Sequence, residues 1–452
     1  MNFESYKISI PENANKIINT LEANGYTAYV VGGCVRDSLM GRKPHDWDIC
    51  TSATPKQMLD IFNEYKVIET GLQHGTVTVV IAGEQYECTT YRIDGAYTDH
   101  RRPDYVKFID DITEDLRRRD FTINAMAYND KEGLIDPFDG TKDIIQKKIR
   151  CVGSAADRFS EDALRILRAI RFAAQLNFTI DMDTDQVIHT KYKSLENISV
   201  ERINSEFSKI VATDNFSVEL VCYKEVFTQF IPELKAMFDF SQNNPHHDYD
   251  VFGHTVHAIE SCSSNDLIIR LAVFFHDFGK PHMYQDGEDG IRHFKGHGRV
   301  SAEMADVIMK RLKFDNDTRK NVVQLIYYHD ATIVVGRKYV KRWLNKLGAE
   351  QFRRLLTVRC ADIKGQKCLY DTEKIKQIAE IENILFEILQ ENICYTLKDL
   401  AINGTDLINI GYTANKQLGT TLEKLLEGVI SETISNNRYE LLEIARTMLN
   451  AE

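Results

Sequence analysis

The chain of 452 residues is long enough for about three domains, each with its own hydrophobic core. Hydrophobic residues make up 43% of it and prolines number only 8, which excludes an intrinsically disordered chain and a collagen-like repeat. The formal net charge of -11 argues against a protein that coats nucleic acid without specificity, because phosphate binding needs clustered cations.

The cysteine content and the hydropathy of the sequence indicate in which cellular compartment the protein is expected. The nine cysteines form no CxxC pair, which favours thiols in a reducing compartment over a disulfide framework or a zinc ribbon. The first residues carry acids and no apolar core, and apolar runs such as TVTVVIA at 76–82 are only as long as a strand. We therefore expect a cytoplasmic protein with no signal peptide and no membrane span.

Secondary-structure signals divide the chain near residue 140. Before it, β-branched or aromatic segments punctuated by glycine predict strands at 27–33, 45–51, 75–92 and 122–128, and 53–65 has helical spacing. From Asp143 onward nearly every segment has the period of a helix. The pattern predicts an α+β fold, with a small N-terminal domain built on one sheet and a helical remainder.

A glycine turn in VVGGCVRD (30–37) ends the first predicted strand and opens a helix. The backbone N–H groups of such a turn can approach a phosphate, and Arg36 can add charge. A Gly-Gly turn can equally be a tight corner and nothing more.

Two carboxylates follow ten residues later in Asp46-Trp47-Asp48. On an extended segment, both carboxylates project to one side and Trp47 to the other. Their mutual repulsion is relieved by a divalent cation, and Mg²⁺ that also bridges substrate phosphates is the natural occupant. Glu87 could add a third carboxylate from a neighbouring strand. The alternatives are a surface DxD near a turn and a solvated strand residue.

The segment RRRDFTINA (117–125) places cations beside an acid just before an apolar stretch. Arg119 can meet a triphosphate, and Asp120 or Asn124 could reach a ribose hydroxyl.

A helix predicted at 158–176 carries charges three residues apart along one side: Asp162, Arg165, Arg168 and Arg171. One interpretation is an exposed charged face with a weak salt bridge. The other is recognition of a base, in which Asp162 accepts from an exocyclic amino group and Arg165 donates to a ring nitrogen or carbonyl. Cytosine and adenine both present an amino group beside an acceptor, whereas uracil and guanine present a carbonyl there. Such a pair can select C and A without a nucleic-acid template.

Taken together, these motifs resemble the tRNA nucleotidyltransferases (CCA-adding enzymes) and related poly(A) polymerases, class II of the polymerase-β-like superfamily. The resemblance implies that Asp46 and Asp48 hold catalytic Mg²⁺. It also implies that nucleotides are bound at the positions Gly33, Arg36, Arg119, Asp162, Arg165, Arg168 and Arg171. The loop at 91–104 matches the family's loop for switching to ATP.

The activity implied is template-independent addition of CCA to the tRNA 3′ end from CTP and ATP. The 3′-hydroxyl attacks the α-phosphate and pyrophosphate leaves. A poly(A) polymerase and an enzyme that adds only A or only CC remain alternatives.

Eight of the 13 histidines lie between residues 246 and 297. The order His…His-Asp…Asp within helical segments is typical of HD phosphohydrolase domains. By that resemblance the ligands of a divalent transition metal are His254, His276, Asp277 and Asp330, with His297 and His329 available for a second metal or a phosphate. The alternatives are an HD scaffold without turnover and an HD nucleotide phosphohydrolase whose N-terminal domain senses nucleotides.

The resemblance implies four domains: a polymerase-β-like nucleotidyltransferase head (1–142), a helical neck with the nucleotide-selecting helix and an RNA-binding region (143–243), an HD domain (244–335) and a helical tRNA-binding tail (336–452). Charge is unevenly spread among them. Residues 336–367 carry ten Lys and Arg against Glu350 and Asp362. We expect a basic track there that contacts the backbone of a tRNA substrate.

Overall fold

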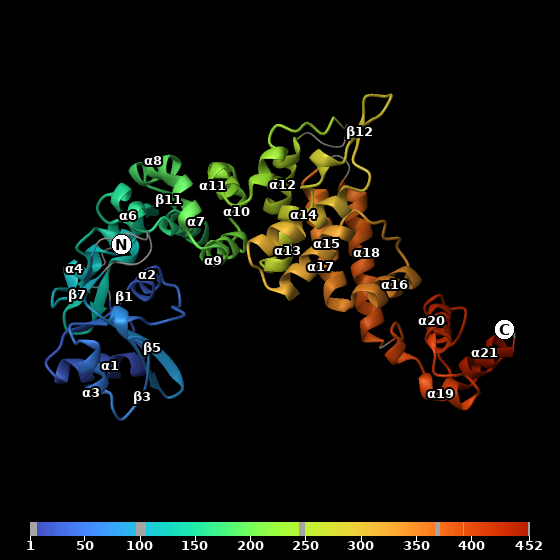
Figure 1. Cartoon of the computed structure of the whole chain (residues 1–452), viewed down its shortest axis with the longest axis horizontal. Coiled ribbons are helices and arrows are strands. Elements are labelled where there is room, and N and C mark those ends of the chain that lie inside the picture. Colours follow the sequence, from blue (N-terminus) through green and yellow to red (C-terminus); the bar gives the residue numbers. More distant parts are fainter. Residues whose placement is uncertain (1–6, 96–104, 244–248, 367–370, 392, 451–452) are drawn as a thin grey trace. The chain divides into compact units, whose positions relative to one another are not determined.

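The structure is a computed structural model that describes residues 7–95, 105–243, 249–366, 371–391 and 393–450, the side chains of residues 73 and 371 excepted. The chain divides into two compact units, Met1–Pro232 and Glu233–Glu452. Figure 1 shows the elements of each unit, and each is described by itself below.

The N-terminal part of the first unit contains a seven-stranded mixed sheet. Its strand order is β3-β4-β5-β2-β1-β8-β9. Only β2 and β5 pair in parallel, and the other neighbours are antiparallel. The strands are β1 (Ala28–Val31), β2 (Ile49–Thr51), β3 (Lys66–Gly71), β4 (Thr76–Ile81), β5 (Glu84–Thr90), β8 (Ala127–Asn129) and β9 (Gly133–Ile135).

The predicted stretch 75–92 forms a hairpin of β4 and β5. Alternate residues of β4 are buried, as expected for a strand with one face on a core. Ala82 and Gly83 between the strands have φ of 53° and 85°, the left-handed conformation that a tight two-residue hairpin turn requires. The predicted strand at 122–128 instead begins with a 3₁₀ turn, η2 (Thr122–Asn124), before β8.

Helices flank this sheet: α1 (Glu12–Ala23), α2 (Gly33–Leu39), α3 (Pro55–Ile61), α4 (Ile112–Arg117) and α5 (Gly140–Gln146), with a 3₁₀ turn η1 (Leu72–His74). Thr54 and Gln57 form a reciprocal capping box at the start of α3, which explains why the predicted helix begins there. α1 packs against β1, β2 and α3 (Figure 1).

A helical segment completes the first unit: α6 (Ala155–Glu161), α7 (Leu164–Leu176), α8 (Met182–Lys191), η3 (Tyr192–Asn197), α9 (Val200–Val211), α10 (Phe216–Cys222) and α11 (Lys224–Thr228). The expectation of one helix over 158–176 is wrong. The helical conformation is interrupted at Asp162, which has φ of -147° and ψ of 103°. α6 therefore ends before Asp162, and α7 begins after it.

The second unit is helical: η4 (Pro232–Met237), α12 (Val251–Glu260), α13 (Leu267–Phe275), η5 (Lys280–His282), α14 (His297–Arg311), α15 (Asn316–Tyr328), α16 (Arg337–Leu347), α17 (Ala349–Lys364), α18 (Asp371–Gln390), η6 (Leu397–Asp399), α19 (Gly404–Asn409), α20 (Lys416–Ile430) and α21 (Arg438–Asn450). α13 is apolar except for the buried Arg270, and it packs against α12, α15 and α17.

Three short strand pairs complete the secondary structure: β6 (Arg92–Asp94) with β7 (Val106–Phe108), β10 (Lys148–Ile149) with β11 (Thr179–Ile180), and β12 (Gln285–Asp286) with β13 (Arg292–His293). The predicted α+β fold, a mixed-sheet head followed by helices, is confirmed. Among the described helices, none has the length and apolar character needed to cross a membrane.

Candidate functional site

The glycine turn connects β1 to α2, with Gly32 as the residue that caps the helix. Its φ of 80° and ψ of -126° lie in a region that favours glycine. A Cβ atom on Gly32 would lie 3.1 Å from Nη1 of Arg119, and one on Gly33 would lie 3.6 Å from Nη2 of Arg36. Two guanidinium groups therefore lie beside this turn, as an anion site requires.

The three predicted carboxylates meet at the start of the parallel strand pair. Ile49 of β2 is in register with Cys88 of β5, so the preceding residues, Asp48 and Glu87, are neighbours. Desolvation by nearby protein atoms raises the pKa of Asp48 although part of the residue remains accessible, Glu87 and Asp46 raise it further, and Arg119 acts in the opposite direction. All three carboxylate residues are exposed to solvent, and Trp47 is half-buried. A crowded, accessible set of oxygen ligands fits Mg²⁺.

Arg119 is held by Asp115, a residue that the sequence analysis missed. Nη2 of Arg119 lies 3.5 Å from Asp115 Oδ2, and Arg118 donates to Oδ1 of the same carboxylate at 3.0 and 2.8 Å. Asp115 is only 1% exposed. Burial opposes its ionisation, but Arg118 and Arg119 keep its pKa below the usual value. Asp115 thereby fixes Arg119 beside the glycine turn.

The side chains of Asp120 and Asn124 are buried and hydrogen-bonded to other side chains of the same chain. Oδ2 of Asp120 accepts from Nε of Arg168 at 2.8 Å, and its Oδ1 accepts from Nδ2 of Asn124 at 3.2 Å. Asn124 in turn accepts from Nη1 of Arg36 at 2.6 Å. Burial opposes the charge on Asp120, yet Arg168 and Arg165 lower its pKa to about 2. This network joins the glycine turn to α7.

The predicted row of charges on α7 is paired with residues of α6 and α9. Arg165 donates to Glu161 Oε2 at 2.6 Å, and the Asp162 carboxylate accepts from both terminal nitrogens of Arg202 at 3.2 and 2.7 Å.

Arg171 does not lie on an exposed face, because it is only 8% exposed. Its guanidinium donates to Glu206 Oε2 at 2.5 Å and lies 4.0 Å from the centre of the Phe172 ring. Nη1 of Arg168 lies 4.0 Å from Oε1 of the same Glu206. Arg202 and Glu206 were missed by the sequence analysis. Their opposite charges four residues apart in VERINSEF are the signal that could have drawn attention to them.

The predicted histidine cluster assembles in the second unit from four helices and the turn after α13. Nε2 of His254 on α12 lies 3.1 Å from Nε2 of His276, which follows α13. A second pair, His297 at the start of α14 and His329 at the end of α15, has the same Nε2 separation of 3.1 Å.

Asp277 lies between the two histidine pairs. Its Oδ2 is 3.3 Å from His254 and 3.2 Å from His276, and its Oδ1 is 3.2 Å from His297. Lys280 Nζ lies 2.7 Å from Oδ2 and forms an ion pair with this carboxylate. Two groups with metal-ligand geometry share this carboxylate: His254 with His276 and Asp277, and Asp277 with His297 and His329.

The structure places Asp362, and not the expected Asp330, beside His254 and His276. Asp362 Oδ1 lies 3.0 Å from His254 Nε2 and 3.6 Å from His276 Nε2. The Asp330 side chain is 48% exposed, and its Oδ2 is 3.8 Å from Nδ1 of His297. Asp362 lies on α17, far along the chain and within no motif, so its role could be found only from the fold. A cavity of about 310 Å³ adjoins His329, Asp330 and Asp362.

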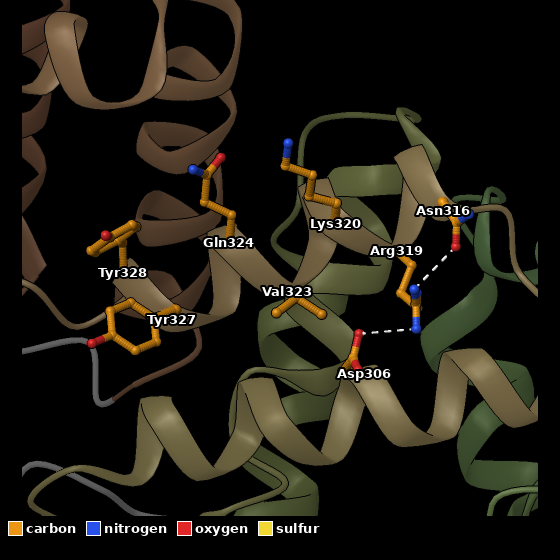
Figure 2. Close-up of a pocket in the computed structure, with 8 residues that line it drawn as sticks. All are labelled: Asp306, Asn316, Arg319, Lys320, Val323, Gln324, Tyr327 and Tyr328. Carbon is orange, nitrogen blue, oxygen red and sulfur yellow. Dashed lines mark hydrogen bonds and ion pairs between the residues drawn. The ribbon is translucent and has the colours of Figure 1, made fainter.

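A separate open groove of about 610 Å³ lies on α14 and α15 (Figure 2). Its lining includes Lys320, Val323 and Tyr327, and Arg319 is held there by Asp306 at 3.4 Å. The groove is lined neither by the carboxylates near the glycine turn nor by the histidine cluster, so we assign it no catalytic role.

Part of the positive charge of the expected basic track at 336–367 is paired with acids of the protein. Arg337 pairs with Glu391 at 2.5 Å, Lys341 with Glu432 at 2.8 Å, and Arg342 with Glu427. These cations connect α16 to the segments around α18 and α20, and so they stabilise the helical packing.

Three family descriptions match consecutive parts of the chain. "Poly A polymerase head domain" matches residues 28–150, "Probable RNA and SrmB- binding site of polymerase A" matches 177–238, and "tRNA nucleotidyltransferase domain 2 putative" matches 288–445.

Curated relatives are described as CCA-adding enzymes. The protein from Lactobacillus johnsonii is 33% identical over 428 residues, which cover 94% of this chain and 95% of the relative. The protein from Oceanobacillus iheyensis is 52% identical over 197 residues, but this alignment spans only 44% of the chain and 49%, about half, of that relative.

Solved structures agree in fold. The CCA-adding enzyme of Bacillus stearothermophilus, solved in complex with CTP, has a TM-score of 0.72 and 27% identity over 97% of both chains. The Thermotoga maritima CCA-adding enzyme, complexed with tRNA, has a TM-score of 0.60 and 20% identity, covering 98% of this chain and 97% of that one.

Proposed function

Because this chain belongs to the family of CCA-adding enzymes, which are tRNA nucleotidyltransferases, we propose that it adds CCA to the 3′ end of tRNA from CTP and ATP without a template. The observation that carries the proposal is the convergence of Asp46, Asp48 and Glu87 near Arg119 and the glycine turn. Carboxylates for a metal and cations for a triphosphate are the two requirements of nucleotidyl transfer.

The catalytic step we propose is in-line attack of the tRNA 3′-hydroxyl on the α-phosphate, with pyrophosphate leaving. Mg²⁺ held by Asp46, Asp48 and Glu87 would supply Lewis acidity to the phosphate and the attacking hydroxyl. Arg119, Arg36 and the N–H groups around Gly33 would bind the triphosphate and offset its charge. Asp120 and Asn124 hold Arg168 and Arg36 in place, and we assign them this positioning role together with any contact to the ribose.

Base selection is proposed for Asp162 and Arg165. A carboxylate accepts hydrogen bonds only, so Asp162 accepts from the amino group that cytosine and adenine share and repels the carbonyl oxygen of uracil and guanine. Arg165, which donates only, suits the neighbouring acceptor on the base. Arg168 and Arg171, linked through Glu206, would support this helix beside the nucleotide.

The test uses tRNA that ends at the discriminator base, incubated with labelled CTP alone, ATP alone and both. The proposal predicts two C residues from CTP alone and a complete CCA end from both nucleotides. Addition of A alone, of C alone in the presence of ATP, or of a long A tail would favour the corresponding alternative enzyme.

A second activity is favoured by one specific observation, the buried Asp277 carboxylate between two histidine pairs. We propose that His254, His276, Asp277 and Asp362 hold a divalent transition metal, and that His297 and His329 hold a second metal or a phosphate. Such a site would hydrolyse a phosphate ester in the adjoining cavity. Release of p-nitrophenol from p-nitrophenyl phosphate with Mn²⁺ or Ni²⁺, but not with EDTA, tests it. Release that persists in His276→Ala would contradict it.

We also propose a cytoplasmic location. Its support is that the eight cysteines within the described residues are all free, as expected in a reducing compartment.

A further inference from the structure

The proposed base-selecting residues, Asp162 and Arg165, do not contact each other through their side chains. They are three residues apart, a spacing at which opposite charges pair when both lie on one helix, but Asp162 precedes α7 in an extended conformation. Within the described residues, the Asp162 carboxylate binds the Arg202 side chain and the Arg165 guanidinium binds Glu161. Arg165 also donates to the backbone carbonyls of Arg158 and Arg118. Each of the two side chains is therefore held by its own partners.

The backbone around Asp162 supplies only one of the contacts that fix its side chain. Asp162 lies in an extended conformation between α6 and α7, so no helical turn restricts its rotamer. Its orientation comes from three donors. The backbone N–H of Leu164 and Nη1 of Arg202 donate to Oδ1 at 3.1 and 3.2 Å, and Nη2 of Arg202 donates to Oδ2 at 2.7 Å.

A forked pair of hydrogen bonds defines the plane of a carboxylate as well as its position. Arg202 reaches Asp162 from α9, forty residues along the chain, and its side chain is 24% exposed. Each carboxylate oxygen has two acceptor sites, so Asp162 can keep Arg202 and still accept from the amino group of a base.

We propose that Arg202 is a positioning residue for nucleotide selection: it holds the Asp162 carboxylate away from Arg165, so that both side chains present their hydrogen-bonding groups to the incoming base. This inference rests on the proposed CTP and ATP selection and deepens it. Without Arg202, the freed Asp162 carboxylate turns to Arg165, and the two groups that read the base neutralise each other.

The experiment compares Arg202→Ala with wild type, measuring kcat/KM for CTP and for UTP on tRNA that ends at the discriminator base. The ratio between the two nucleotides is the decisive quantity, because a merely structural defect lowers the active fraction equally for both. We expect this ratio to fall about tenfold or more, the scale of one misaligned hydrogen bond to a charged group, with most of the loss in KM for CTP. Lys209→Ala, at the exposed end of the same helix, should leave the ratio unchanged.

Two further variants complete the test. Arg202→Gln keeps a polar side chain but is too short to replace the guanidinium fork, and it serves if Arg202→Ala unfolds; its ratio should also fall. In an Arg165→Ala background, removal of Arg202 should change the ratio much less, because the side chain that captures Asp162 is gone. An unchanged CTP/UTP ratio in a folded Arg202 variant overturns the inference. A wild-type protein that incorporates neither CTP nor ATP contradicts the proposed function itself.

Discussion

The Asp120 carboxylate binds the Arg168 guanidinium through Nε at 2.8 Å and Nη2 at 2.6 Å. Asp120 directly follows Arg119 in the segment RRRD (117–120), and Arg168 is in the middle of α7. Both nitrogens contact the same oxygen, Oδ2, and the ion pair connects the segment that contains Arg119 with the helix that carries Arg165. The residues proposed for triphosphate binding and those proposed for base selection are therefore linked through it.

Replacement of Asp120 by Asn should destabilise the protein as well as slow nucleotide addition. Asp120 is 8% exposed, and the change leaves the Arg168 charge without its main partner. We expect a loss of about 2 kcal/mol or more in the free energy of unfolding, measured by urea denaturation at neutral pH. Asp60→Asn, an exposed carboxylate on α3, is the control and should be neutral.

The same ion pair should give the wild type a defined pH dependence. The folded-state pKa of Asp120 is about 2, below its value of 3.8 in the unfolded chain, so its stabilisation is complete above pH 4. It should be lost as the pH falls from about 4 to 2. Denaturation midpoints measured across this range should converge for wild type and Asp120→Asn. A constant difference between them would argue against an ionised Asp120.

Combined replacement of Asp46 and Asp48 by Ala should lower the rate of CTP and ATP incorporation by at least about 100-fold, because the metal ligands are lost. The same variant should retain any hydrolysis of p-nitrophenyl phosphate, whose proposed ligands lie in the other unit. Retained nucleotide incorporation would refute the assignment of these two carboxylates.

Glu87→Gln should raise the Mg²⁺ concentration needed for half-maximal nucleotide incorporation. Glu87 is close enough to raise the pKa of Asp48, so its charge would also act on an ion held by Asp48. Glu69→Gln, an exposed carboxylate on β3 of the same sheet, is the matched control. Equal Mg²⁺ dependence in the two variants would make Glu87 a solvated strand residue and nothing more.

Asp362→Ala and Asp330→Ala should differ in metal content. Asp362 lies against His254 and His276, whereas the Asp330 side chain is half exposed. After loading with Mn²⁺ and gel filtration, elemental analysis should find metal in Asp330→Ala at the wild-type level and much less in Asp362→Ala. The reverse result would restore Asp330 as the ligand.

Local motifs allowed much of the head to be predicted from the sequence. The glycine turn lies between a strand and a helix as predicted, and the predicted strand stretch 75–92 forms the paired strands β4 and β5. The DxD pair directly precedes β2, which is shorter than the predicted strand at 45–51. The partners of Arg202, Glu206 and Asp362 could not be found in this way, because only the tertiary fold brings them near. Asp115, by contrast, lies three and four residues before Arg118 and Arg119, a local spacing that the sequence analysis overlooked.

One error has a physical cause. The helical period continues through Asp162, but its side chain and an extended backbone satisfy the first N–H groups of α7, so the helix restarts there. The RNA-contacting surface at 336–367 stays a prediction, and the structure adds that acids from distant segments bind three of its cations, Arg337, Lys341 and Arg342.

The most direct test of the account is the product that the wild-type protein makes on a tRNA lacking its CCA end, sequenced after incubation with equal concentrations of all four nucleoside triphosphates and Mg²⁺. We predict a 3′ end of CCA on nearly every extended molecule, with U and G absent from the added positions. Products that carry U or G at frequencies comparable to C and A, or no extension at all, would contradict a template-independent selection by Asp162 and Arg165.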